Sequence, residues 1–245
     1  MANGPAPAPP RERSLRSRPL VRAVAPGLVL VALGLVVFAG LLDAVREQDD
    51  LTTVDRPVLT WLVDRRGPGL TAVLEVITFV SGPTVLPVLV AVAAVVWAVA
   101  RHERWRPALL VAAMLGSTAL SLAVKGLVDR PRPPEDTMLV PGAESTASFP
   151  SGHTLGTATL LLVTAYLTTS RHDSARGVVG WALGTVVGVV LVALSRLYLG
   201  YHFLTDVLAS IALAVAVLGA VMVVDRLHLL RRSATAPPPG DPHVG

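Results

Sequence analysis

Long apolar runs separated by short charged connectors dominate the chain. Residues 23–42 carry no charged side chain, and as a helix they are long enough to cross the roughly 30 Å of a bilayer's hydrocarbon core. Arginines precede this run, as in a signal peptide, but the run exceeds the ~7–15 apolar residues usual there. We therefore interpret it as an uncleaved first span. Similar runs predict further spans at about 84–100, 107–124, 155–170, 178–194 and 203–224.

The pattern predicts an all-α fold, a polytopic membrane bundle of six transmembrane helices. The membrane domain is expected over residues 21–232. The Pro-rich segments 1–20 and 233–245 are expected to be disordered and cytoplasmic, because their composition offers little apolar surface to bury.

Between spans 1 and 2 the pattern changes. Within residues 54–65 apolar positions, Trp61 among them, recur at helical spacing, while charged residues occupy the other faces. This predicts a short amphipathic helix lying at the membrane interface, with Trp61 as an anchor. Residues 70–80 are also apolar, and Ser81-Gly82-Pro83 ends that run.

Composition supports a membrane protein and narrows the chemistry. Hydrophobic residues make up 52% of the chain and charged residues 16%, whereas a soluble domain carries about 25% charge. The net charge is +4, but the arginines are dispersed between apolar runs, which argues against nucleic-acid binding. The absence of cysteine excludes a disulfide framework and a thiolate nucleophile or metal ligand.

Basic residues also predict the orientation. More of them lie in the connectors on the amino-terminal side than on the opposite side, so both termini are expected to be cytoplasmic. Six spans place the connector between spans 3 and 4 and the one between spans 5 and 6 together on the extracytoplasmic side.

Those two connectors hold a distinctive set of residues. Three cations lie in or beside them, and arginine and lysine suit phosphate oxygens. A Ser-Gly pair opens span 4, where free N–H groups and the helix dipole attract an anion. The cations and the pair are Lys125, Arg132, Arg196, Ser151 and Gly152. Together they predict a phosphate site.

Two histidines accompany this site. His202 and Asp206 are four residues apart and share a helical face, so the carboxylate can fix the imidazole tautomer and leave the other nitrogen as nucleophile or base. His153, on another helix, is available as the acid. The His202–Asp206 pair could instead bind a metal, but no third ligand is evident nearby. We therefore expect neither metal nor cofactor, and we assign Arg130 no role.

Three stretches of the chain resemble the signature of the type 2 phosphatidic acid phosphatase superfamily, which includes lipid phosphate phosphatases, bacterial undecaprenyl pyrophosphate phosphatases and vanadium haloperoxidases. Every signature position is filled, in the stretches that run from Lys125 to Arg132-Pro133, over Pro150-Ser151-Gly152-His153, and from Ser195-Arg196 through His202 to Asp206.

The resemblance implies a metal-independent mechanism. His202 would attack phosphorus and form a phosphohistidine, Asp206 would orient its ring, and His153 would protonate the leaving oxygen and then activate water. The phosphate oxygens would be held by Lys125, Arg132, Arg196, the Ser151 hydroxyl and the Gly152 amide.

We therefore expect a plasma-membrane phosphatase that acts on a lipid phosphate at the outer leaflet. Undecaprenyl diphosphate, slightly favoured, phosphatidic acid and phosphatidylglycerophosphate all fit. A lipid-linked phosphotransferase and a non-catalytic phospholipid-binding or transport protein are the alternatives. The bilayer and the lipid are the expected partners, nucleic acid is not, and the oligomeric state stays open.

Overall fold

The computed structural model describes residues 10–47, 50–170 and 174–235, and every regular element within them is a helix. In chain order the helices are α1 (Pro10–Glu47), α2 (Asp50–Thr53), α3 (Asp55–Val63), α4 (Pro68–Val80), α5 (Val85–Ala100), α6 (Trp105–Val128), the 3-10 turn η1 (Glu135–Thr137), α7 (Gly152–Thr169), α8 (Ala175–Tyr198) and α9 (Leu204–Thr235). The all-α prediction is confirmed.

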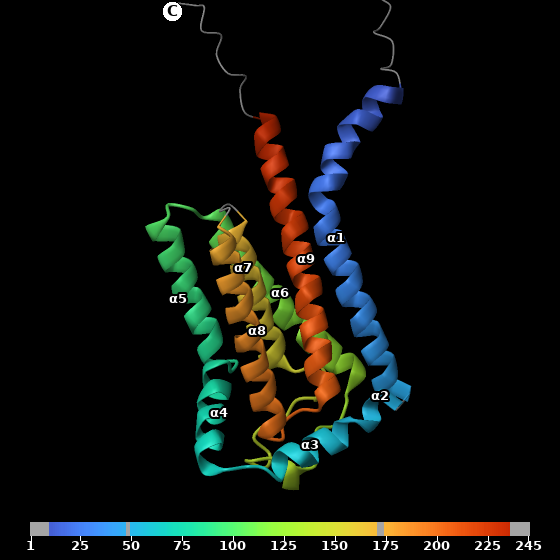
Figure 1. The fold of residues 1–245 in the computed structure, drawn as a ribbon, viewed down its shortest axis with the longest axis vertical. Helices are drawn as coiled ribbons and strands as arrows, with labels where there is room; N and C mark the ends of the chain where they lie inside the picture. Colours follow the sequence, from blue (N-terminus) through green and yellow to red (C-terminus); the bar gives the residue numbers. More distant parts are fainter. Residues whose placement is uncertain (1–9, 48–49, 171–173, 236–245) are drawn as a thin grey trace, which may run out of the picture.

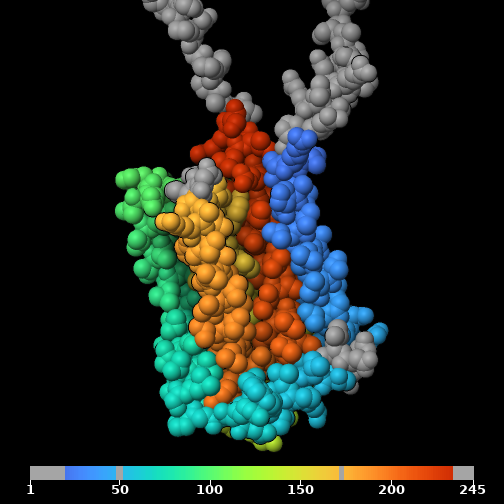
Figure 2. All heavy atoms as spheres, viewed as in Figure 1, coloured from blue at the N-terminus to red at the C-terminus, as the bar shows by residue number. Residues whose placement is uncertain are grey.

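The long helices run side by side, and α3 crosses one end of the bundle (Figure 1). The start of α1 and the end of α9 lie together at the opposite end (Figure 1). Apolar side chains of α5 and α8 are exposed, including Val92 and Val187, as is expected of helices that face lipid. In the space-filling view α8 forms part of the visible surface between α4–α5 and α9 (Figure 2).

Four helices are long and apolar enough to cross a membrane, namely α1, α6, α8 and α9. The pair α4 and α5 passes the same test together, with a bend of 56° at the short break between them. That break follows Val80, where Ser81-Gly82-Pro83 was expected to end a helix. The structure therefore supports a membrane bundle with four or five candidate spans, and the count of six stays a prediction.

Helix α7 explains much of that difference. It covers the predicted fourth span but is not among the candidates by length and hydropathy. It packs against α6, α8 and α9, and Thr154, Thr157 and Thr159 are buried in its contacts. A helix surrounded by protein needs less apolar surface than one surrounded by lipid, which is why the hydropathy of α7 is modest.

Helices α1 and α9 extend into the segments 1–20 and 233–245, whose disorder stays a prediction. Helix α1 begins at Pro10 and α9 continues to Thr235. Proline is tolerated in the first turn of a helix, and the Arg, Glu and Leu residues that follow favour helix. Residues 1–9 and 236–245 lie outside the described ranges.

Close contact between α1 and α9 depends on glycine. A Cβ atom on Gly34 would lie 2.5 Å from the carbonyl oxygen of Ala212, and one on Gly219 would lie 2.5 Å from that of Gly27. Any larger residue at these positions forces the two backbones apart. The helices can therefore pack against each other over much of their length (Figure 1).

The predicted amphipathic segment 54–65 is helical from Asp55 to Val63. Leu59 and Leu62 are buried, whereas Trp61 is 56% exposed. Asp55 is the exception to the amphipathic pattern, because its carboxylate is buried. The position of this helix in the membrane interface stays a prediction.

Candidate active site

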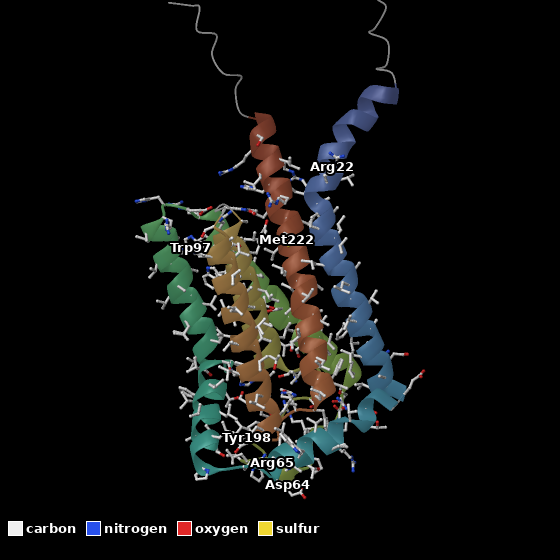
Figure 3. The ribbon with its side chains drawn as sticks, viewed as in Figure 1. Arg22, Asp64, Arg65, Trp97, Tyr198 and Met222 are labelled. Carbon is white, nitrogen blue, oxygen red and sulfur yellow. The ribbon has the colours of Figure 1, made fainter. Side chains whose placement is uncertain are left out.

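The residues predicted to form a site come together at the end of the bundle that α3 crosses. They lie in the last turns of α6 and α8, at the starts of α7 and α9, and in the connectors between those helices. Tyr198, two residues after Arg196, marks this end in Figure 3, whereas Arg22 lies toward the other end. The site therefore lies far from both described ends of the chain.

His202 and Asp206 form a buried pair. His202 Nδ1 lies 3.3 Å from Asp206 Oδ2, and the same oxygen accepts hydrogen bonds from Ser148 Oγ at 2.5 Å and from the Phe203 backbone N–H at 2.9 Å. The other ring nitrogen, Nε2, lies 3.4 Å from Arg132 Nη1. A guanidinium only donates, so this arrangement places the proton on Nδ1 and the lone pair on Nε2.

A glycine turn brings His202 to this position. Gly200 follows α8 with φ of +78°, a left-handed conformation that favours glycine. A Cβ on Gly200 would also lie 2.1 Å from the carbonyl oxygen of Thr137. The turn lets the chain reverse within a few residues, so that His202 and Asp206 face the connector that carries Arg132.

Arg132 and Arg196 are held in fixed orientations. Arg132 donates from Nη1 to the Tyr201 carbonyl at 2.8 Å and from Nε to the Thr146 carbonyl at 2.7 Å. Arg196 is 1% exposed and donates from Nη1 to Thr78 Oγ1 at 2.5 Å. Its buried Nε has no hydrogen-bond partner within the described chain. This donor is free for an additional acceptor.

Glu144 joins the two arginines, and sequence reasoning missed it. Its Oε2 pairs with Arg132 Nη2 at 2.7 Å, and its Oε1 pairs with Arg196 Nη2. Burial alone would raise the pKa of this carboxyl, but Arg196, His202 and Arg132 outweigh burial and lower the pKa to about 2. Glu144 is therefore an anion between the two cations. Nothing local in the sequence distinguishes it from the other acids in the connectors.

Lys125, Gly152 and His153 line a cavity of about 270 Å³ together with Glu144. Lys125 Nζ also donates to the Ala147 carbonyl. The rest of the lining is largely apolar and includes Leu86, Met114, Leu122 and Leu155. The cavity thus has a charged end beside the arginine pair and an apolar end between α5, α6 and α7.

Ser151 differs from this group. Its side chain is fully buried, its hydroxyl lies 3.1 Å from Thr154 Oγ1, and it does not line the cavity. Its backbone N–H donates to the Asp206 carbonyl at 3.4 Å. In this structure Ser151 fixes the start of α7 against the start of α9.

The buried imidazole of His202 is held neutral. Burial lowers its pKa, Arg196 and Arg132 act in the same direction, and the hydrogen bond and charge of Asp206 oppose them, so that the pKa lies at about 4. A neutral ring with a free Nε2 lone pair beside the Arg132 guanidinium is suited to attack an anionic, electrophilic group. Within the described ranges no group of three or more His, Cys, Asp or Glu side chains is arranged to hold a metal ion.

A membrane bundle with a buried His–Asp pair beside an arginine pair defines a class of phosphate-processing membrane proteins. The model of the PAP2 superfamily matches residues 106–228, half of the chain, and includes all the predicted site residues. The chain belongs to the PAP2 superfamily and is a phosphoric monoester hydrolase of the membrane type.

Relatives of known name agree with this assignment. Phosphatidylglycerophosphatase B of Bacillus subtilis strain 168 is 27% identical over 186 residues, which cover 73% of this chain and 87% of that protein. The crystal structure of a transmembrane PAP2-type phosphatidylglycerolphosphate phosphatase from Bacillus subtilis matches with a TM-score of 0.70 and 26% identity, over 81% of this chain and 95% of that one. LpxE of Aquifex aeolicus shares the fold, with a TM-score of 0.50 and 20% identity over 71% of this chain and 95% of its own.

Proposed function

We propose that the protein removes phosphate from a lipid at the outer leaflet through a phosphohistidine on His202. The observation that carries this proposal is the geometry of His202: Nδ1 faces Asp206 while Nε2 faces the arginine pair. A phosphate held by the arginines would present its phosphorus to the Nε2 lone pair. Binding without turnover needs the cations alone, so the buried His–Asp pair favours catalysis over a binding or transport role.

In the first step Nε2 attacks phosphorus and the bond from phosphorus to the lipid oxygen breaks. Burial and Arg196 lower the pKa of His153 to about 3, so its ring is neutral beforehand; it relays a proton from the bound monoanionic phosphate to that leaving oxygen. In the second step His153 takes a proton from water, the water oxygen attacks the phosphohistidine, and the bond from phosphorus to nitrogen breaks. Inorganic phosphate and the neutral, Asp206-paired His202 result.

Charge stabilisation comes from the cradle around the phosphate. Lys125, Arg132, Arg196 and the Gly152 amide are proposed to hold the three equatorial oxygens, an arrangement that usually supplies the largest catalytic contribution. Ser151 would have to turn its hydroxyl from Thr154 to join them. Glu144 occupies the anion position between the arginines in this structure, so phosphate binding has to displace its carboxylate.

The substrate is proposed to be an amphiphile. The cavity beside Lys125 and His153 is charged at one end and apolar at the other, which suits a phosphate joined to a lipid chain. The named function of the Bacillus relative favours phosphatidylglycerophosphate. Phosphatidic acid and undecaprenyl diphosphate are the other members of the proposed substrate class.

The membrane arrangement proposed here has six spans, with α7 among them and α3 in the interface. Both termini are cytoplasmic and the site is extracytoplasmic. The arginine distribution supports this orientation, and the position of the site at the end opposite α1's start and α9's end agrees with it (Figure 1).

Phosphate release from a panel of purified lipid phosphates tests the function. The wild-type protein is expected to release phosphate, and His202→Ala is expected to release none. His102→Ala, an exposed histidine between α5 and α6, is the matched control and should keep full activity. Release by His202→Ala at the wild-type rate would contradict the proposal. Transfer of phosphate to an added alcohol, in place of water, would identify a phosphotransferase.

A further inference from the structure

Arg130 joins two buried carboxylates that come from helices far apart in the sequence. Its Nη1 lies 2.5 Å from Asp206 Oδ1, and its Nη2 lies 2.7 Å from Asp55 Oδ2. Asp55 is 2% exposed, Asp206 is fully buried, and the Arg130 side chain is 13% exposed. Asp55 lies on α3, outside the residues that the family model matches.

Asp55 is also bound to the residue that precedes Asp206. Its Oδ1 accepts a hydrogen bond from the Thr205 backbone N–H at 2.9 Å, and its Oδ2 accepts one from Thr205 Oγ1 at 2.6 Å. The Arg130 guanidinium lies over the Phe203 ring, 4.5 Å from its centroid. Asp55 therefore contacts both Arg130 and the first turn of α9, and Arg130 packs on the residue that links His202 to α9.

These contacts determine which oxygen of Asp206 faces the imidazole. Arg130 binds Oδ1 of Asp206. The other oxygen, Oδ2, faces His202 Nδ1 and accepts hydrogen bonds from Ser148 Oγ and the Phe203 N–H. A guanidinium prefers to bind one carboxylate with two parallel hydrogen bonds. Because Nη2 of Arg130 donates to Asp55, it is not available for a second, parallel hydrogen bond to Asp206. Without Asp55, Arg130 is free to take both oxygens of Asp206.

We propose that Asp55 is a positioning residue that acts through Arg130 to keep Oδ2 of Asp206 directed at the imidazole of His202. This inference rests on the proposed function, in which His202 is the nucleophile. It assigns to α3 a role in catalysis beyond covering the end of the bundle. Asp55 does not touch the arginine pair of the cradle, so it acts on the chemical step and not on phosphate binding.

Asp55→Asn tests this assignment in the full-length protein. The variant keeps the shape of the side chain but loses the charge that holds Nη2. We expect kcat to fall on the order of 10- to 100-fold, as for other residues that orient a reacting group. KM for the lipid and the inhibition constant for inorganic phosphate should both stay within about twofold, because the cradle is untouched. Asp64→Asn is the matched control, since Asp64 is an exposed acid just after the same helix.

A double-mutant cycle distinguishes positioning from mere anchoring of α3. If Asp55 acts through Arg130, adding Asp55→Asn to Arg130→Gln changes kcat by less than about twofold. Arg130→Lys gives an independent check if Asp55→Asn folds poorly, because one ammonium group keeps the charge but cannot bridge both carboxylates at these distances. It should show the same loss of kcat with unchanged inhibition by inorganic phosphate.

Three results would overturn the inference. These are wild-type kcat in Asp55→Asn, kcat losses that multiply in the Asp55→Asn/Arg130→Gln protein, and a loss of affinity for inorganic phosphate that matches the loss of kcat. The His202→Ala variant separates this failure from failure of the proposed function. If His202→Ala is inactive while Asp55→Asn is unaffected, only the role of Asp55 is wrong; if His202→Ala is active, the nucleophile itself is wrong.

Discussion

At the scale of single residues, the site is a small set of charges whose balance decides what it can bind. Glu144 lies between Arg132 and Arg196 as a phosphate group would, with one carboxylate oxygen on each guanidinium. It keeps the arginines neutralised and oriented in the absence of substrate. The same contacts make it a competitor for any phosphate that enters.

Glu144→Gln is therefore expected to strengthen inhibition by vanadate and by inorganic phosphate. Loss of the partly exposed charge should lower both inhibition constants about five- to tenfold, equivalent to about 1 kcal/mol. Glu135→Gln, an exposed acid in the same connector, is the control and should have no effect. Unchanged or weaker inhibition in Glu144→Gln would mean that the carboxylate is required to orient the arginines.

The pH dependence follows from His202. Only the neutral imidazole can attack phosphorus, and burial lowers the pKa of this ring to about 4. The inactive imidazolium therefore forms only as pH falls toward 4, well below the ordinary histidine value of about 6.5. We expect no loss of kcat/KM from this group between pH 7 and pH 5, because kcat/KM reports on the free enzyme. A fall of kcat/KM with a midpoint near 6.5 would contradict the neutral His202.

Which residues the site contains was only partly predictable. Lys125, Arg132, Arg196 and His202 could be grouped from the sequence because helix topology places their connectors at one end. Glu144, Arg130 and Asp55 could not, because their partners are remote in the chain and no local pattern records such pairs. The sequence pattern places Asp55 off the apolar face of segment 54–65, yet Asp55 is buried because Arg130 and Thr205 satisfy its oxygens.

At the scale of elements, α1 packs along α9, and the close approach at Gly34 and Gly219 joins α1 to the rest of the bundle. The predicted apolar runs all lie in helices, but a helix whose polar side chains are buried by protein need not pass as a membrane span by hydropathy. Helix α7 is the clearest case: its buried threonines lower its hydropathy without exposing it to lipid. Hydropathy measures transfer to lipid, so it undervalues a helix that other helices surround.

Two glycines of α1 give a matched test of this packing. A Cβ on Gly34 would lie 2.5 Å from the Ala212 carbonyl oxygen, whereas a Cβ on Gly40 has no neighbour within 4 Å. Gly34→Ala should destabilise the protein by about 1–3 kcal/mol through overpacking. Gly40→Ala should be neutral or stabilising by up to about 1 kcal/mol through helix propensity. Thermal unfolding in detergent measures both, and equal melting temperatures would show that α1 does not pack on α9 at Gly34.

At the scale of the whole molecule, the start of α1 and the end of α9 lie at the end of the bundle opposite the candidate site (Figure 1). The helices carry apolar residues outward and bring the charged residues of distant connectors together at one end (Figure 3). A substrate whose phosphate is in water and whose chain is in lipid can reach such a site without leaving the membrane. The site is proposed to face the exterior, which requires the termini to be cytoplasmic.

That orientation can be tested with single cysteines, because the natural chain has none. In intact cells, a cysteine in place of the exposed Glu135 at the site end is expected to react with a membrane-impermeant thiol reagent. A cysteine in place of the exposed His102 at the other end should react only after the cells are lysed. The reverse pattern would place the site in the cytoplasm.

If His202 carries the phosphoryl group during turnover, a phosphohistidine can be trapped on it. A radiolabelled lipid phosphate is mixed with the purified protein, the reaction is stopped with alkali, and the label is located on the separated peptides. The label is expected on the peptide that contains His202, where it should be stable to base and lost in acid. No label is expected in His202→Ala. Label on any other residue would contradict it, and so would continued phosphate release by His202→Ala.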